Sequence, residues 1–361
     1  MAAVVALGLA VAACRGGAGE REVRGSAAAV DELFARFTRG QAPGCALAVV
    51  EGGRVALARG YGFADLALRR PITPRTVFDV ASVGKQFTAA SVLLLAARGK
   101  LSLDDDVRKY LPELPRYDAT ITLRHLLYHE SGLPDYISLL ARAGKRYEDV
   151  TTDGDALAAL AGDRQPLQFR PGTAFHYSDS GYVLLSLVVE RVTGQTLREL
   201  AGETFFAPLG MTDTSIVDDP RRLPPRRALA YSPTAAGGYL PDDASWMQTG
   251  DGGVNTTVLD LAKWDANLDS GAVGGRALAA AMTAPGTLAD GRPLSYAGGL
   301  FLDRFHSLRR QRHPGSWRGW SAESMRLPER RLAVITLCNR SDADPTSLCE
   351  EVAELMLKQA R

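Results

Sequence analysis

Ser82 and Lys85 stand three residues apart at the start of an apolar segment that ends near Gly99. In a helix, residues three apart lie on one face, so this hydroxyl and this amine can meet. A serine beside a lysine is a nucleophile beside a base, which is the pair that acyl transfer through a covalent intermediate requires. The same spacing also arises when a serine caps a helix and the lysine lies in solvent. The pair alone therefore leaves a structural interpretation open.

The apolar segment after Lys85 predicts a buried helix with Ser82 at its N-terminus. Free N–H groups and the positive end of the helix dipole gather there, and both favour negative charge on a serine oxygen. Tyr177 and Asp179 lie on a predicted loop just before a helical run over residues 183–192. A phenol placed there can reach Ser82. His313 precedes Gly315 in a segment predicted to be a strand on the other wall of the same site.

These three segments resemble the signatures S-x-x-K, Y-x-N and K/H-x-G of the serine β-lactamase and penicillin-binding peptidase superfamily. The resemblance is to its class C-like branch, which holds DD-carboxypeptidases, D-aminopeptidases and family VIII esterases. It extends from residue 43 to the C-terminal helix, in the family's order. It implies an α/β plus all-α fold, with an antiparallel sheet flanked by N- and C-terminal helices and an inserted, mainly helical region.

The resemblance also assigns roles to the catalytic residues. Ser82 is expected to attack a carbonyl and form an acyl-enzyme that water hydrolyses. Lys85 acts as a base only if it loses its charge or shares a proton with Tyr177, and the resemblance makes Tyr177 the base that activates water. His313 belongs to the third motif and is expected to be catalytic.

The third motif is expected to supply the substrate-binding strand as well. The N–H groups of Ser82 and Ser316 would form the oxyanion hole. Gly315 would let the substrate lie close to the strand.

Two residues depart from the family pattern. Asp179 stands where asparagine is usual, and an ionised carboxylate only accepts hydrogen bonds where an amide also donates. Its negative charge also favours the protonated form of Lys85 and shifts the role of base to Tyr177. Pro314 stands where threonine is common, which removes a hydroxyl that binds a substrate carboxylate. Both departures argue against a strong β-lactamase.

The sequence therefore predicts a serine hydrolase that acts on an ester or amide, of the esterase or D-amino-acid peptidase type. The alternative is a catalytically weak lipoprotein that binds β-lactams or cell-wall fragments. A small-molecule or peptide substrate is expected in either case. The net charge of +1, from 42 basic and 41 acidic residues, gives no reason to expect a nucleic-acid partner. No cofactor is implied, and His125, His129, His176 and His306 lack metal-binding spacing, so we expect surface or structural histidines.

The first residues predict export. An apolar run over residues 2–13 ends at Cys14 in a pattern that matches a bacterial lipobox, although no Lys or Arg precedes it. We expect a signal peptide over 1–13, a lipidated Cys14 as the only link to a membrane, and a tether over 14–26. The protein would then be periplasmic or a membrane-anchored lipoprotein of a bacterium. Cleavage after an Ala-Val-Ala site is the alternative.

The remaining chain, residues 27–361, is predicted to form one hydrolase domain with a helical insertion at about 105–290. Alternating segments at 46–50 and 54–61 predict a hairpin, and further strands are expected at 296–302, 321–327 and 332–337. A closing helix is expected at 346–357. Cys45, Cys338 and Cys349 permit at most one internal disulfide, and three buried thiols are the expectation.

Overall fold

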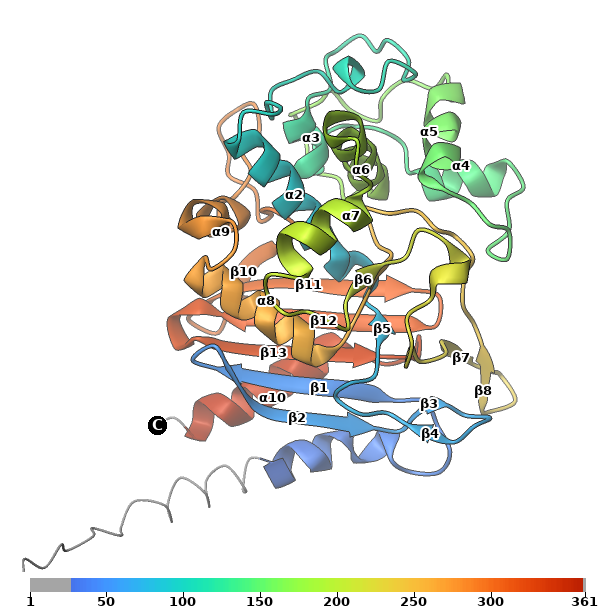
Figure 1. The fold of residues 1–361 in the computed structure, drawn as a ribbon, viewed down its shortest axis with the longest axis vertical. Coiled ribbons are helices and arrows are strands. Elements are labelled where there is room, and N and C mark those ends of the chain that lie inside the picture. Colours follow the sequence, from blue (N-terminus) through green and yellow to red (C-terminus); the bar gives the residue numbers. More distant parts are fainter. Residues whose placement is uncertain (1–26, 360–361) are drawn as a thin grey trace, which may run out of the picture.

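The computed structural model describes residues 27–359. The predicted signal segment 1–13, Cys14 and the tether 14–26 lie outside the described residues. A six-stranded antiparallel sheet forms the lower part of the molecule in Figure 1. Its strands, in spatial order, are β10 (Phe301–Phe305), β11 (Leu308–Trp317), β12 (Trp320–Leu327), β13 (Leu332–Cys338), β1 (Cys45–Glu51) and β2 (Arg54–Tyr61). The predicted antiparallel sheet, with strands from both the early and the late part of the chain, is confirmed.

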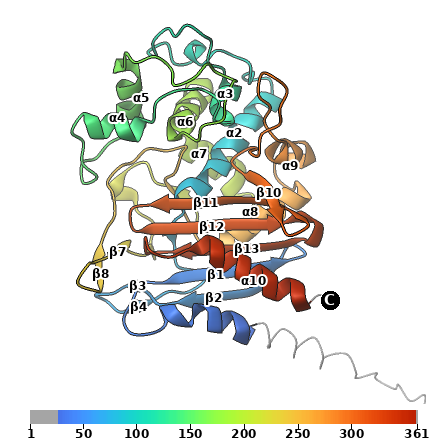
Figure 2. The same ribbon diagram turned by 180° about the vertical axis from the view of Figure 1, so that it is seen from behind.

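Helices cover both faces of this sheet, which explains why β1 and β13 are buried and apolar almost throughout. In β1, Leu47 and Val49 face one core while Ala48 and Val50 face the other. The helix over residues 27–34 and α10 (Pro345–Gln359) lie on the first face, as Figure 2 shows. On the second face α8 (Val258–Ser270) packs against β1, β2 and β13.

The rest of the helical region lies above the sheet (Figure 1). Its helices are α2 (Lys85–Ala97), α3 (Leu123–Leu127), α4 (Tyr136–Arg142), α5 (Asp153–Gly162), α6 (Asp179–Thr193), α7 (Leu197–Ala201) and α9 (Gly275–Thr283). The central helix α2 packs against α6, α7 and α9 and is apolar nearly all round, as its continuous apolar sequence predicts. Within residues 27–359 no helix has the length and hydrophobicity needed to cross a membrane.

Small sheets connect the two regions. The strands β5 (Phe78–Asp79), β9 (Val254–Thr256) and β6 (Ser215–Ile216) form one of them, directly before α2. Two hairpins at the side pair β3 (Phe63–Asp65) with β4 (Arg70–Pro71) and β7 (Tyr231–Pro233) with β8 (Tyr239–Pro241).

The strand expected at 296–302 is displaced, since β10 begins only at Phe301. Gly299 has a positive φ of 74°, and a Cβ there would lie 2.7 Å from the backbone nitrogen of Gln86. The chain therefore turns against α2 before it becomes extended.

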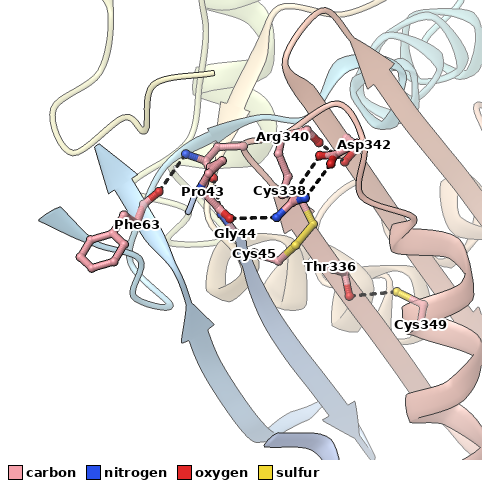
Figure 3. The surroundings of a disulfide bond; sticks show 11 residues. Pro43, Gly44, Cys45, Phe63, Thr336, Cys338, Arg340, Asp342 and Cys349 are labelled. Atoms are coloured by element: carbon pink, nitrogen blue, oxygen red, sulfur yellow. Dashed lines mark hydrogen bonds and ion pairs between the residues drawn. A yellow bond between two sulfur atoms is a disulfide. The ribbon is translucent and has the colours of Figure 1, made fainter. Parts of the chain in front are cut away.

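A disulfide joins the adjacent strands β1 and β13, which corrects the expectation of three thiols. Cys45 of β1 lies directly opposite Cys338 of β13, and their sulfur atoms are bonded (Figure 3). Closing so long a loop stabilises the fold mainly by restricting the unfolded chain, typically by about 2–5 kcal/mol. Cys349 of α10 stays a buried thiol, 3.2 Å from the hydroxyl oxygen of Thr336. Pairing depends on strand register, which cysteine spacing does not reveal.

Candidate active site

Ser82 lies in a tight turn between the small sheet and α2. It belongs to a 3-10 helix, η2 (Ala81–Gly84), so it precedes the α-helix rather than occupying its first turn. Ala81, just before it, has a φ of 47°, which is costly for a residue other than glycine. The Asp79 carboxylate accepts a hydrogen bond of 2.8 Å from the Ala81 N–H and so holds this conformation.

Lys85 is fully buried beneath Ser82, and all three of its N–H donors have acceptors. Its Nζ lies 3.0 Å from Ser82 Oγ, 2.6 Å from Asp179 Oδ1 and 2.7 Å from the carbonyl oxygen of Asp251. Burial alone lowers the pKa of Lys85, but the facing charge of Asp179 raises it, and the net direction is upward. Lys85 is therefore an ammonium that donates to the serine oxygen.

Tyr177 is the second titratable group at the nucleophile. Its ring centroid is 5.0 Å from Lys85 Nζ, and the ring lies between His129, at 4.4 Å, and Phe301, at 6.1 Å. Burial raises the pKa of the Tyr177 phenol; Lys85 lowers it, Asp179 raises it again, and the net direction is upward. At rest the site thus holds an ammonium and a neutral phenol side by side.

His313 packs beside Tyr177, with ring centroids 6.0 Å apart. Its Nδ1 donates to the Pro314 carbonyl at 2.6 Å, and its Nε2 accepts from the Tyr296 hydroxyl at 3.2 Å. Burial lowers its pKa to about 3, so the ring is neutral. With both nitrogens occupied, His313 positions the aromatic wall and has no free atom for proton transfer.

Gly315 makes a close contact within the protein that the sequence did not predict. A Cβ there would lie 2.2 Å from the carbonyl oxygen of Val80, so glycine is needed where β11 packs against the segment that carries Ser82. Ser316, the next residue, is exposed and lines the same pocket as Ser82. The two residues expected to supply oxyanion N–H groups therefore border one cavity.

That cavity has a volume of about 280 Å³ and opens above Ser82. Trp246 and Trp317 form part of one wall, with ring centroids 6.1 Å apart. Trp320 packs edge-on against Phe78 in the core.

Sequence reasoning missed the contacts of three residues of the site, Asp251, Tyr136 and His129. Asp251 binds Lys85 through its carbonyl, and its carboxyl accepts a 2.9 Å hydrogen bond from Tyr136. His129 was expected to be an ordinary structural histidine. It is buried against Tyr177, and its Nε2 has no partner among the described residues. The Gly252-Gly253 pair after Asp251 was the only signal for that loop.

The part of the chain that the structure describes holds no group of His, Cys, Asp and Glu side chains arranged to bind a metal ion.

Comparison with known proteins defines the class. Residues 30–355 match the family described as Beta-lactamase, and the chain belongs to that family. A D-aminopeptidase of Gluconobacter oxydans is 31% identical over 316 residues, covering 88% of this chain and 59% of that protein. Penicillin-binding protein 4* of Bacillus subtilis is 30% identical, covering 81% and 67%. The structure of an octameric penicillin-binding protein homologue from Pyrococcus abyssi superposes with a TM-score of 0.81 at 26% identity, over 93% of this chain and 77% of that one.

The strained turn before Ser82 gives a prediction. Asp79→Ala removes the acceptor that holds Ala81, so we expect a fluorophosphonate probe to label Ser82 about fivefold more slowly, the effect of losing about 1 kcal/mol. Ala81→Gly in the same background should recover part of that rate, because glycine adopts positive φ freely. Both rates are read by gel fluorescence, with thermal melts as the folding control. Labelling of Asp79→Ala at the parent's rate would contradict the role of this carboxylate.

Proposed function

We propose that the protein is a serine hydrolase that forms an acyl-enzyme on Ser82 with ester or amide substrates. The observation that carries the proposal is the 3.0 Å contact between Ser82 Oγ and a buried Lys85 at the base of a pocket that also borders Ser316. The chain spans only 59% of the D-aminopeptidase that it resembles, so the substrate type, esterase or D-amino-acid peptidase, is part of this proposal.

The protonation states of Lys85 and Tyr177 determine which group acts in each step of the reaction. Tyr177 serves as base after it has lost its proton, and the adjacent Lys85 ammonium stabilises the resulting phenolate. As Ser82 Oγ attacks the carbonyl carbon, its proton passes to Tyr177. The N–H groups of Ser82 and Ser316 then stabilise the oxyanion of the tetrahedral intermediate.

Collapse of this intermediate breaks the ester or amide bond. The leaving group takes the proton from Tyr177, and the acyl group stays on Ser82. Water attacks the acyl-enzyme in the second half, with Tyr177 again taking the proton. Lys85 keeps its charge throughout, because Asp179 and the Asp251 carbonyl continue to accept from it.

The two departures from the family pattern bear on substrate choice. Asp179 Oδ1 is bound to Lys85, and the residue has no amide group to donate to a substrate carbonyl. Pro314 lies within β11, opposite Glu323, and has neither a hydroxyl nor an N–H to offer. Both favour simple esters and amino-acid amides over β-lactams and peptides with a terminal carboxylate.

The central test uses Ser82→Ala with a fluorophosphonate probe and a p-nitrophenyl ester. We expect loss of labelling and at least a thousandfold loss of ester turnover, because Ser82 is the one hydroxyl in the described chain that contacts Lys85. Tyr177→Phe should lower turnover about a hundredfold while the protein stays folded. Intact-mass spectra recorded after exposure to a penicillin distinguish turnover from a lasting adduct. A lasting adduct would favour the alternative, a catalytically weak lipoprotein that binds β-lactams. Undiminished labelling of Ser82→Ala would refute the proposal.

Export as a lipoprotein is a further part of the proposal, supported by the apolar run before Cys14. In a bacterial host the protein should partition into detergent, and Cys14→Ser should release it to the aqueous phase. Phase separation followed by N-terminal mass analysis measures both. A soluble parent that retains residues 1–13 would exclude a lipid anchor.

A further inference from the structure

We propose that His129 is a positioning residue for the base, which holds the Tyr177 phenol beside Lys85 by binding the backbone on both sides of Tyr177. The inference rests on the proposed hydrolase function, in which Tyr177 takes the proton of Ser82. His129 acts through Tyr177 and takes no part in the proton transfer itself.

The backbone around Tyr177 depends on His129. Residues 174–178, which carry the phenol, form no helix or strand. The His176 N–H donates to the His129 carbonyl at 2.9 Å, and the Ser178 N–H donates to His129 Nδ1 at 3.1 Å. Backbone N–H groups need an acceptor when they leave water, and a segment outside regular secondary structure must find it elsewhere. One residue thus fixes the chain directly before and directly after Tyr177.

The His129 side chain also packs on the Tyr177 ring. The two ring centroids are 4.4 Å apart, and the angle between the ring planes is 31°. Tyr296 and Tyr182 enclose the same imidazole, with centroids at 4.7 and 5.0 Å. His129 is only 1% exposed, so its ring cannot turn away without displacing these neighbours. Its acceptor atom and its packing face are therefore held in one orientation.

His129 occupies this place at a cost to stability. Its φ of 58° lies in the left-handed region, which residues other than glycine adopt rarely. Burial, reinforced by the charge of Lys85, lowers the pKa of His129 well below its usual value, so the ring is neutral and Nδ1 can accept. Its Nε2 then carries the proton, and this buried atom has no partner among the described residues. An apolar side chain would avoid that unpaired N–H, but it could not hold the Ser178 N–H.

The position of the phenol matters because its neighbours set its protonation. Burial raises the pKa of Tyr177, and the charge of Lys85 opposes this rise. The titratable side chains that face the phenol are Lys85, Asp179, Tyr182, His129, His313 and Tyr296. Among these six, only Lys85 and Asp179 are charged at neutral pH, because burial keeps the tyrosines and histidines neutral. A phenol that moves away from the ammonium is therefore harder to deprotonate.

The test compares two substitutions that remove different parts of the His129 side chain. His129→Phe keeps an aromatic ring but has no acceptor. His129→Asn places an amide oxygen near the position of Nδ1, and asparagine tolerates a positive φ. With a p-nitrophenyl ester we expect His129→Phe to lower kcat at least about tenfold and to change KM less than about threefold, because Tyr177 serves acylation and deacylation alike. His129→Asn should lower kcat by less than about threefold, since the Ser178 N–H keeps its acceptor.

A double-mutant cycle separates positioning from a merely structural role. In a Tyr177→Phe background there is no phenol left to position, so adding His129→Phe should lower kcat by no more than about twofold. A residue that only supports the fold would lower kcat by the same factor in both backgrounds. In the single variant His129→Phe the pH at which acylation rises should move upward by at least about half a unit, because the phenol lies further from Lys85.

His125→Phe is the matched control. His125 also accepts a backbone N–H through its Nδ1, from Thr122 at 3.2 Å, but it belongs to α3 and lies outside the pocket. Its kcat and pH profile should equal the parent's. Thermal melts check that each variant folds. If His129→Phe does not fold, His129→Gln takes its place with the same expected losses, since its amide lies one carbon further out than Nδ1.

The outcomes separate the two claims. A parent-like kcat in His129→Phe, an equal loss in both backgrounds, or a loss in His129→Asn as large as in His129→Phe overturns this inference and leaves the hydrolase function standing. Acylation that rises at the parent's pH or below it in His129→Phe does the same. If Tyr177→Phe alone keeps the parent's kcat, both this inference and the role of Tyr177 as base are wrong. Absence of Ser82-dependent labelling and of ester turnover in the parent overturns the proposed function and this inference together.

Discussion

The burial of one ammonium group, that of Lys85, constrains the rest of the site. A charge taken out of water is costly unless it is paired and fully hydrogen-bonded. Ser82, Asp179 and the Asp251 carbonyl each accept one of its three protons, and no donor is left over. Each acceptor comes from a different part of the chain, so the ammonium fixes three segments at once.

The surrounding fold makes those three segments meet. The Val80 N–H donates to the Val254 carbonyl, and Gly315 lets β11 approach the Val80 carbonyl closely. The turn with Ser82 is therefore held between the small sheet and the edge of the large one. Asp179 arrives as the first residue of α6, and its own N–H donates to Asp135. The helical region thus delivers the carboxylate, while the sheet region positions the serine.

The sequence was enough for the parts that depend on local pattern. The spacing of Ser82 and Lys85, the position of Tyr177 before a helix and the alternation of β1 and β2 all follow from periodicity and motif order. Contacts between distant segments were not predictable in this way. The Asp251 carbonyl is a backbone acceptor with no signature, and the disulfide depends on the register of β1 against β13.

Two properties of expected site residues depend on neighbours that are distant in sequence. Burial and the charge of Lys85 lower the pKa of His313 to about 3, and the Val80 carbonyl leaves room only for glycine at position 315. Lys85 and Val80 are both far in sequence from the residues that they affect, and only the fold brings them near. By contrast, the effect of Asp179 on Lys85 was anticipated, because an acidic residue in the second motif already placed a charge near the lysine.

The account's central claim is that Asp179 holds Lys85 and Tyr177 in their protonated forms. The most direct measurement is the pH dependence of the acylation burst with p-nitrophenyl acetate, a neutral ester, in the parent and in Asp179→Asn. Acylation should rise with pH as the base forms. Since the carboxylate raises the pKa of both Lys85 and Tyr177, its replacement by an amide should move this rise to lower pH by about one unit. A rise that stays at the same pH, or moves to higher pH, would contradict the account.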